Sequence, residues 1–217
     1  MQFRDRHEAG QALAEALSFL KGQPDVVILA IPRGGVVVGY QVAKALGLPL
    51  DVYITRKLGA PYNSELALGA VAGDGSIVLD EELIQRLGIP RDYIARERER
   101  QAKEIERQLE RYRGDRKPLD LKDKIVVLVD DGVATGSTTR AAIQSLRKHP
   151  LRKLILAIPV GPPETAAMLS KEVDQGVFLS TPEHFWAVGG FYLTFDQTSD
   201  DEVVALLRES ALEQPQA

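Results

Sequence analysis

Residues 125–139 read IVVLVDDGVATGSTT and contain an apolar run, two acids and the start of a helix. The first five residues are all apolar, as expected for a central strand that is covered on both faces. Asp130 and Asp131 follow, and a run of small and hydroxyl residues then leads into a helix predicted over 138–148. This succession of strand, tight loop and helix is typical of an α/β protein.

The same alternation of short apolar runs and helical patterns continues along the chain. It predicts a Rossmann-like parallel sheet of about five strands with flanking helices. The predicted strands cover 26–31, 51–55, 124–129, 154–160 and 177–180, and the other core helices cover 5–19, 36–46, 163–171 and 200–212.

Two further segments elaborate this sheet. The glycine-rich turn at 73–75 lies between the apolar runs 67–71 and 76–79, which predicts a hairpin at or near a sheet edge. Residues 91–113 form a long, highly charged helical pattern. Its apolar residues are spaced 3, 4 and 3 apart, which predicts a solvated helix that packs one narrow stripe on the domain or on a second subunit. These residues are Ala102, Ile105, Leu109 and Tyr112.

Length, charge and composition exclude several classes. The 217 residues indicate one domain over 1–217, with a helical insertion at about 80–117 and a C-terminal hood at about 181–217. The net charge of −4 provides no global positive field and disfavours nucleic acid as a partner, and the interleaved acids of 91–113 disfavour RNA binding there. No cysteine is present, which excludes disulfide scaffolds and thiol nucleophiles. Without a membrane span or a signal pattern, the predicted location is cytoplasmic.

The loop after the two acids has the properties of a phosphate site. Backbone N–H groups of residues 134–138 at a helix N-terminus would point outward unpaired. The hydroxyls of Thr135, Ser137, Thr138 and Thr139 would add donors, so no lysine is needed. Asp130 and Asp131 could accept hydrogen bonds from ribose hydroxyls or hold water ligands of Mg²⁺. A Walker loop is excluded because Ser137, not Lys, follows Gly136, and GxGxxG is absent. A loop whose small residues only cap a helix remains the alternative.

This segment resembles the PRPP-binding motif of type I phosphoribosyltransferases. The resemblance implies a Mg²⁺-dependent pentosyltransferase that displaces pyrophosphate from PRPP with a nitrogenous base. It implies catalytic and metal-binding roles for Asp130 and Asp131. It also implies that the 5′-phosphate is bound by Ala134, Thr135, Gly136, Ser137 and Thr138.

A second segment, Arg33-Gly34-Gly35, follows the first central strand and precedes a helix. Arg33 supplies a forked donor, and the two glycines expose N–H groups to an anion. In the resembled family this position holds the pyrophosphate loop, with a non-proline cis peptide expected near Pro32-Arg33-Gly34. A glycine turn with a surface arginine is the alternative.

The segment 55–67 is rich in charge, Gly and Pro and is expected to be a mobile loop. It resembles the family's lid, which implies that Arg56 and Lys57 reach the leaving pyrophosphate. Tyr62 and Glu65 are the candidates beside the incoming base, and Lys57 and Glu65 are counted among the catalytic residues. A surface loop with scattered charges is the alternative.

The resemblance leaves the acceptor base open. Ala134 stands where 6-oxopurine transferases carry an Asp, which disfavours hypoxanthine and guanine. In the hood, Phe185 or Trp186 is a candidate to stack on the base. A second interpretation is a non-catalytic PRPP- or nucleotide-sensing regulator, with 91–113 as a partner or homodimer surface.

Overall fold

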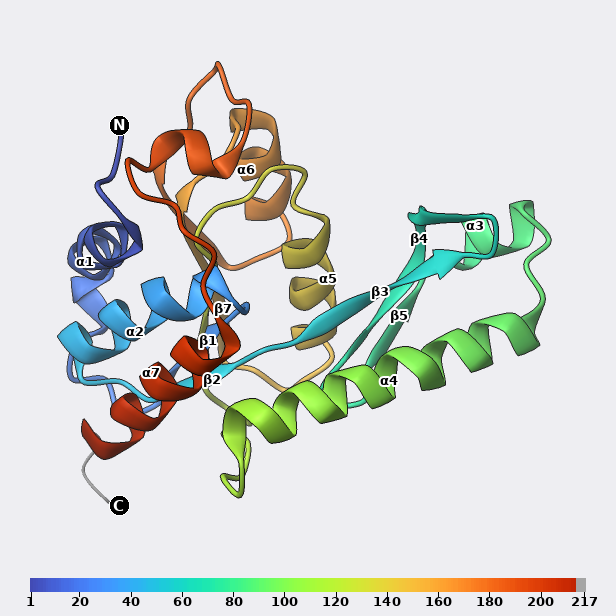
Figure 1. Ribbon diagram of the computed structural model, residues 1–217, viewed down its shortest axis with the longest axis horizontal. Helices are drawn as coiled ribbons and strands as arrows, with labels where there is room; N and C mark the ends of the chain where they lie inside the picture. The colour runs from blue at the N-terminus through green and yellow to red at the C-terminus, as the bar shows by residue number, and fades with distance from the viewer. Residues whose placement is uncertain (214–217) are drawn as a thin grey trace.

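The computed structural model describes residues 1–213, with only the backbone of Ser64 and Glu65, and consists of a body and a protruding arm (Figure 1). The body contains a five-stranded parallel sheet in the order β2-β1-β6-β7-β8. All five predicted parallel strands are confirmed. Their bounds are β1 Val26–Ala30, β2 Leu50–Val52, β6 Ile125–Val129, β7 Lys153–Val160 and β8 Gln175–Ser180.

Helices cover both faces of this sheet. Side chains of β1 alternate between the faces: Ile28 belongs to one buried cluster with residues of α1, α2 and α7, and Leu29 to a second cluster with residues of α5 and α6. This double burial explains why β1 and β6 are apolar throughout. The helices are α1 Arg6–Ala16, α2 Gly34–Leu46, α5 Ser137–Leu146, α6 Pro163–Ser170 and α7 Asp200–Glu213.

The arm begins with a second, antiparallel sheet in the order β3-β4-β5. The predicted hairpin is present as β4 (Asn63–Ala72) and β5 (Ile77–Leu79). β5 is an edge strand, as predicted, but of this second sheet and not of the parallel one. The prediction of a mobile loop over 55–67 is wrong. Residues Thr55–Ala60 form β3, which pairs with β4. Pairing satisfies the backbone and buries Leu58 and Leu68, so the local charge did not prevent strand formation.

Two helices complete the arm, α3 (Glu81–Arg86) and α4 (Arg91–Arg113). The bounds of α4 agree with the prediction, and its apolar stripe packs within the chain, against β3, β4 and α7. Ile105 and Tyr112 of this stripe are buried. Among the described residues, no helix is both long enough and apolar enough to cross a bilayer.

The segment between β8 and α7 includes the short 3-10 helix η2 (Val188–Phe191). Phe3, ahead of α1, forms a parallel bridge with Tyr192, the residue directly after η2, and their ring centres lie 5.6 Å apart. The N-terminal residues and the hood segment are therefore packed together, next to the strand end that carries Asp131, because the Tyr192 hydroxyl donates to the Asp131 carbonyl oxygen at 2.5 Å.

Candidate functional site

The loop from β6 to α5 exposes unpaired amides at a helix N-terminus. Ala134, Thr135, Ser137 and Thr138 are exposed. Within residues 1–213, the amides of 134–138 donate to no protein acceptor. Gly136 caps α5 with a φ of 75°, and a Cβ there would lie 2.8 Å from Thr165 Cγ2. Glycine is therefore required at this position, both for the left-handed backbone and for the close packing.

The hydroxyl groups of the loop divide into two sets. The Oγ atoms of Thr135 and Ser137 lie 3.1 Å apart on the exposed side of the loop. Thr139, expected from the sequence to add a donor, is 2% exposed and faces the core of the body. That expectation is wrong because Thr139, the third residue of α5, lies on the buried side of the helix. Donors at this loop therefore come from 134–138.

Asp130 and Asp131 lie beside this loop at the carboxyl end of β6. Asp130 accepts a hydrogen bond from the Asp131 amide at 2.9 Å. Burial, and next the charge of Asp131, raise the pKa of Asp130 well above the usual range of a carboxyl group. A neighbour able to donate hydrogen bonds, such as a ribose hydroxyl, would suit this carboxyl group.

Asp131 is held by an arginine that sequence reasoning missed. Arg6 Nε donates to Asp131 Oδ2 at 2.7 Å, and the two side chains are only 12% and 15% exposed. Arg6 Nη1 donates to the Asp196 carbonyl oxygen at 2.7 Å, and the Arg6 guanidinium lies 3.9 Å from the Phe195 ring centre. No sequence signal marked Arg6, because its partner lies 125 residues away among many other charged residues.

The segment after β1 approaches the same acids. The Pro32–Arg33 peptide bond is cis, as predicted. A Cβ on Gly34 would lie 1.9 Å from Asp131 Oδ2, so only glycine allows the start of α2 to contact the acids. The amides of Gly34 and Gly35 are the first two of α2 and have no acceptor among the described residues. A second helix N-terminus therefore meets the site, as the sequence predicted.

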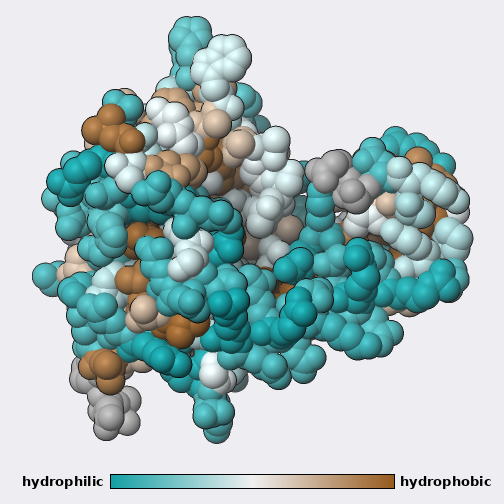
Figure 2. Space-filling view, viewed as in Figure 1, coloured by the Kyte–Doolittle hydropathy of each residue, from teal (hydrophilic) through white to brown (hydrophobic). Residues whose placement is uncertain are grey.

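A polar cleft of about 1670 Å³ connects the phosphate loop with the arm. In Figure 2 the hollow between body and arm is bordered below by hydrophilic residues of α4. The walls bring together Pro32, Arg56 and Lys57 with Thr135, Ser137 and Thr138. Arg56 lines this cleft, and its Nε is buried without a hydrogen-bond partner within the described residues.

Three candidates for the acceptor side are placed differently. Tyr62 lies at the β3–β4 turn, lines the cleft and is 99% exposed. Trp186 is 93% exposed on the hood and is not among the residues that line the cleft. Phe185 stacks on Phe191, with ring centres 5.2 Å apart. The side chain of Glu65 lies outside the described residues. The structure thus brings Tyr62, but neither Trp186 nor Phe185, to the cleft.

The acids fit Mg²⁺ only in part. Within the described residues no three His, Asp or Glu side chains are grouped as a metal site. Mg²⁺ usually keeps several waters and is bound through one or two carboxylates plus substrate phosphates. Asp130 and the Asp131 oxygen that Arg6 leaves uncontacted could serve such an ion, which suits a metal that enters with a phosphorylated substrate.

Comparison with known proteins places the chain in a family. The model of the phosphoribosyl transferase domain matches residues 63–196, and the chain belongs to this family. A Mycobacterium tuberculosis protein (strain CDC 1551 / Oshkosh) named "Putative phosphoribosyl transferase" is 45% identical over 205 residues, 94% of this chain and 46% of that protein. Its counterpart in strain H37Rv shows the same values. The chain thus spans about half the length of the curated relatives it matches.

A solved structure supports the fold. The protein TT1426 from Thermus thermophilus is 44% identical to this chain, with a TM-score of 0.86 over 96% of this chain and 99% of that one. The α/β architecture with a five-stranded parallel sheet is therefore shared, and the family resemblance expected from the sequence is confirmed. The comparisons do not favour the non-catalytic regulator.

Proposed function

We propose that the protein transfers the 5-phosphoribosyl group of PRPP to a nitrogenous base and releases pyrophosphate, in a Mg²⁺-dependent reaction. The observation that carries the proposal is the run of amides at 134–138, which have no acceptor in the described structure and lie directly beside Asp130 and Asp131. This arrangement offers donors for a terminal phosphate and acceptors for sugar hydroxyls within one loop. Membership of the phosphoribosyl transferase family supports the same substrate.

Different residues of the site would bind different parts of PRPP. The 5′-phosphate would bind the amides of 134–138 and the hydroxyls of Thr135, Ser137 and Thr138. Asp130 would accept hydrogen bonds from the ribose hydroxyls. The pyrophosphate would lie between Arg33, the amides of Gly34 and Gly35, and the cationic side chains of Arg56 and Lys57.

The reaction breaks the bond between ribose C1 and the pyrophosphate oxygen and forms a bond from C1 to a base nitrogen. The proton of that nitrogen passes to the departing pyrophosphate or to solvent. Negative charge grows on the departing pyrophosphate, so Arg33 and Lys57 lower the barrier by stabilising that charge. Mg²⁺, when bound with the substrate, would add to this stabilisation. Tyr62 and Glu65 are the proposed neighbours of the base, and Ala134 disfavours a 6-oxopurine.

The direct test is a pyrophosphate-release screen of purines and pyrimidines with PRPP and Mg²⁺. We expect release with at least one base. The double variant Asp130→Asn with Asp131→Asn should lose turnover and keep its circular dichroism spectrum, whereas Asp201→Asn, a 91% exposed acid, should keep both. Unchanged turnover in the double variant would remove the assignment. PRPP binding without release for any base would instead favour the regulator.

A further inference from the structure

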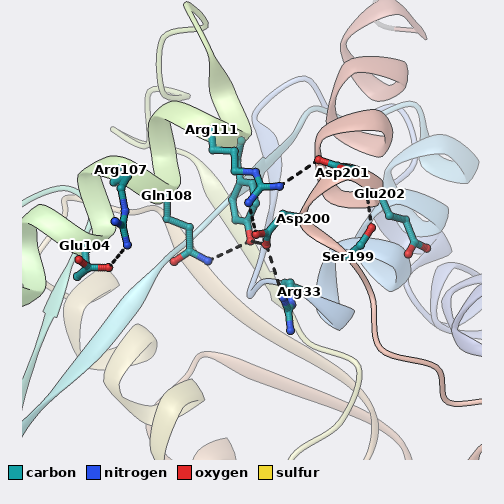
Figure 3. Close-up of polar contacts among 10 residues, drawn as sticks. Arg33, Glu104, Arg107, Gln108, Arg111, Ser199, Asp200, Asp201 and Glu202 are labelled. Carbon is teal, nitrogen blue, oxygen red and sulfur yellow. Dashed lines mark hydrogen bonds and ion pairs between the residues drawn. The ribbon is translucent and has the colours of Figure 1, made fainter.

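Arg33 is contacted by a cluster from two distant helices. Asp200, the first residue of α7, has Oδ1 3.7 Å from Arg33 Nη1. The same Oδ1 accepts a hydrogen bond from the Tyr112 hydroxyl at 2.6 Å, and Oδ2 accepts one from Arg111 Nη1 at 2.6 Å. Figure 3 shows Asp200 between Arg111 of α4 and Arg33. The helical insertion and the C-terminal helix therefore meet at the arginine of the proposed pyrophosphate loop.

The geometry leaves Arg33 able to bind a ligand. A separation of 3.7 Å attracts the guanidinium but exceeds hydrogen-bond distance, so Asp200 does not use up its donors. The Arg33 side chain is 37% exposed. Asp200 in turn is fixed by its stronger contacts to Tyr112 and Arg111. The Tyr112 hydrogen bond, with smaller contributions from Arg111 and Arg33, lowers the pKa of Asp200, which keeps it ionised.

A hydrogen-bonded path extends from Asp200 to the cleft. The Tyr112 ring is buried, and its hydroxyl accepts a hydrogen bond from Gln108 Nε2 at 3.0 Å. Gln108 lines the same cleft as Pro32, the residue before Arg33. One face of α4 thus contributes to the cleft wall and, one turn further on, holds the carboxylate that faces Arg33.

We propose that Asp200 is a positioning residue for Arg33, and that Tyr112 and Gln108 of α4 hold Asp200 in place. The inference rests on the proposed function, because it assigns Arg33 to pyrophosphate. It explains why a pyrophosphate loop in the body needs both α4 and α7: neither the loop nor its neighbours in sequence supply the charge that orients the arginine.

The charges around Asp200 predict whether its neutralisation strengthens or weakens pyrophosphate binding. Asp200 lies between the guanidinium groups of Arg33 and Arg111, so its neutralisation leaves two cations facing each other. Arg33 would then turn away, and pyrophosphate would lose a forked donor. Asp201 is the matched control, because it lies in the same first turn of α7 and contacts Arg111 at 3.1 Å, whereas the ion pair with Arg33 is made by Asp200.

The test is calorimetric titration of inorganic pyrophosphate and of inorganic phosphate, each with Mg²⁺. Loss of a charge-assisted contact predicts that Asp200→Asn weakens pyrophosphate binding about tenfold and leaves phosphate binding within about twofold. Asp201→Asn should change neither affinity. Tyr112→Phe, which keeps the buried ring, should weaken pyrophosphate binding by about threefold. In an Arg33→Ala background, Asp200→Asn should cause no further loss, because it acts through Arg33.

Several results would overturn the inference. Equal pyrophosphate affinities for Asp200→Asn and Asp201→Asn, or a loss that persists without Arg33, would contradict it while the proposed function stands. Tighter pyrophosphate binding by Asp200→Asn would show that Asp200 competes with the ligand. Equal weakening of phosphate and pyrophosphate would indicate a general structural role. If the unaltered protein binds neither anion, the proposed function fails and the inference fails with it.

Discussion

The body and the arm of this protein build their parts of the candidate site in different ways. In the body, the phosphate loop and both acids belong to one continuous segment, 130–138, fixed between a buried strand and a helix. In the arm, the cleft wall is assembled from β3, β4 and α4, which are separated along the chain. Its own buried cluster is small, with Ala60, Leu68, Ile84 and Ile94 as its buried members.

This difference matches a division of labour. Under the proposed function, the features common to any phosphoribosyl donor, a terminal phosphate and two sugar hydroxyls, would face the body. The acceptor, which differs between transferases, would face the arm. A short rigid segment gives a fixed geometry, whereas a wall made of separate elements with a small core opens at lower free energy. We therefore expect amides of β3–β5 to exchange hydrogen faster than those of β1, β6 and β7.

The largest expected effect on stability is the loss of a buried ion pair in the body, compared with the loss of an exposed ion pair in the arm. Arg6→Gln should lower the free energy of unfolding by about 3 kcal/mol, because it leaves the mostly buried Asp131 without its cation. Arg91→Gln in the arm removes the ion pair with Glu81. The Arg91 and Glu81 side chains are 67% and 58% exposed, so this loss should have little measurable effect on stability. Urea denaturation measures both. Equal losses would show that the arm is as tightly integrated as the body.

An effect of intermediate size is expected from alanine substitution at two glycines with positive φ. Gly136 in the phosphate loop has a φ of 75°, and Gly88 in the arm has a φ of 63° with open space around it. Alanine at Gly88 should cost about 1 kcal/mol of stability for the left-handed backbone. Alanine at Gly136 should cost more, because its Cβ would also lie 2.8 Å from Thr165 Cγ2. Only Gly136→Ala should also weaken phosphate binding, by about tenfold. The new methyl group would clash with Thr165, and relief of this clash would shift the loop and its amides. Equal phosphate affinities in the two variants would contradict the role of this loop.

The smallest effect concerns the junction where the arm joins the body. Asp74 accepts hydrogen bonds from Tyr53 at 2.6 Å and from the Ser76 amide at 2.8 Å, and it pairs with His149 at 2.7 Å. Burial alone would raise the pKa of Asp74, but the contacts from Ser76, Tyr53 and His149 together lower it. The carboxylate therefore stabilises the fold above its unfolded pKa of about 3.9, and this stabilisation is lost as the pH falls through the lower folded pKa.

Asp74→Asn should accordingly reduce stability at pH 7 by about 1 kcal/mol. Thermal unfolding of the variant and the unaltered protein from pH 7 down to pH 3 measures the difference, which should shrink below about pH 4. A difference that stays constant over this range would show that Asp74 acts through packing and not through its charge.

The sequence predicted the body far better than the arm. Five apolar or β-branched runs and the helices between them identified the parallel sheet, because strands buried on both faces lack polar residues. The phosphate loop was predictable because all its parts are adjacent in the chain. The segment that forms β3 was predicted as a loop because it contains Arg56, Lys57 and Gly59. It becomes a strand by pairing with β4, which its local sequence does not indicate. Arg6 and Asp200 were missed because contacts over 125 residues or more leave no local pattern.

The central claim is that the amides of residues 134–138 bind a phosphate group. The most direct test is an NMR HSQC spectrum, which correlates amide nitrogen and proton signals. The protein is uniformly labelled with the heavy nitrogen isotope and titrated with ribose 5-phosphate. The account predicts saturable shifts of the amide signals of 134–138 and of no signal in β4 or β5. Unchanged signals at 134–138, or saturable shifts confined to the arm, would contradict it.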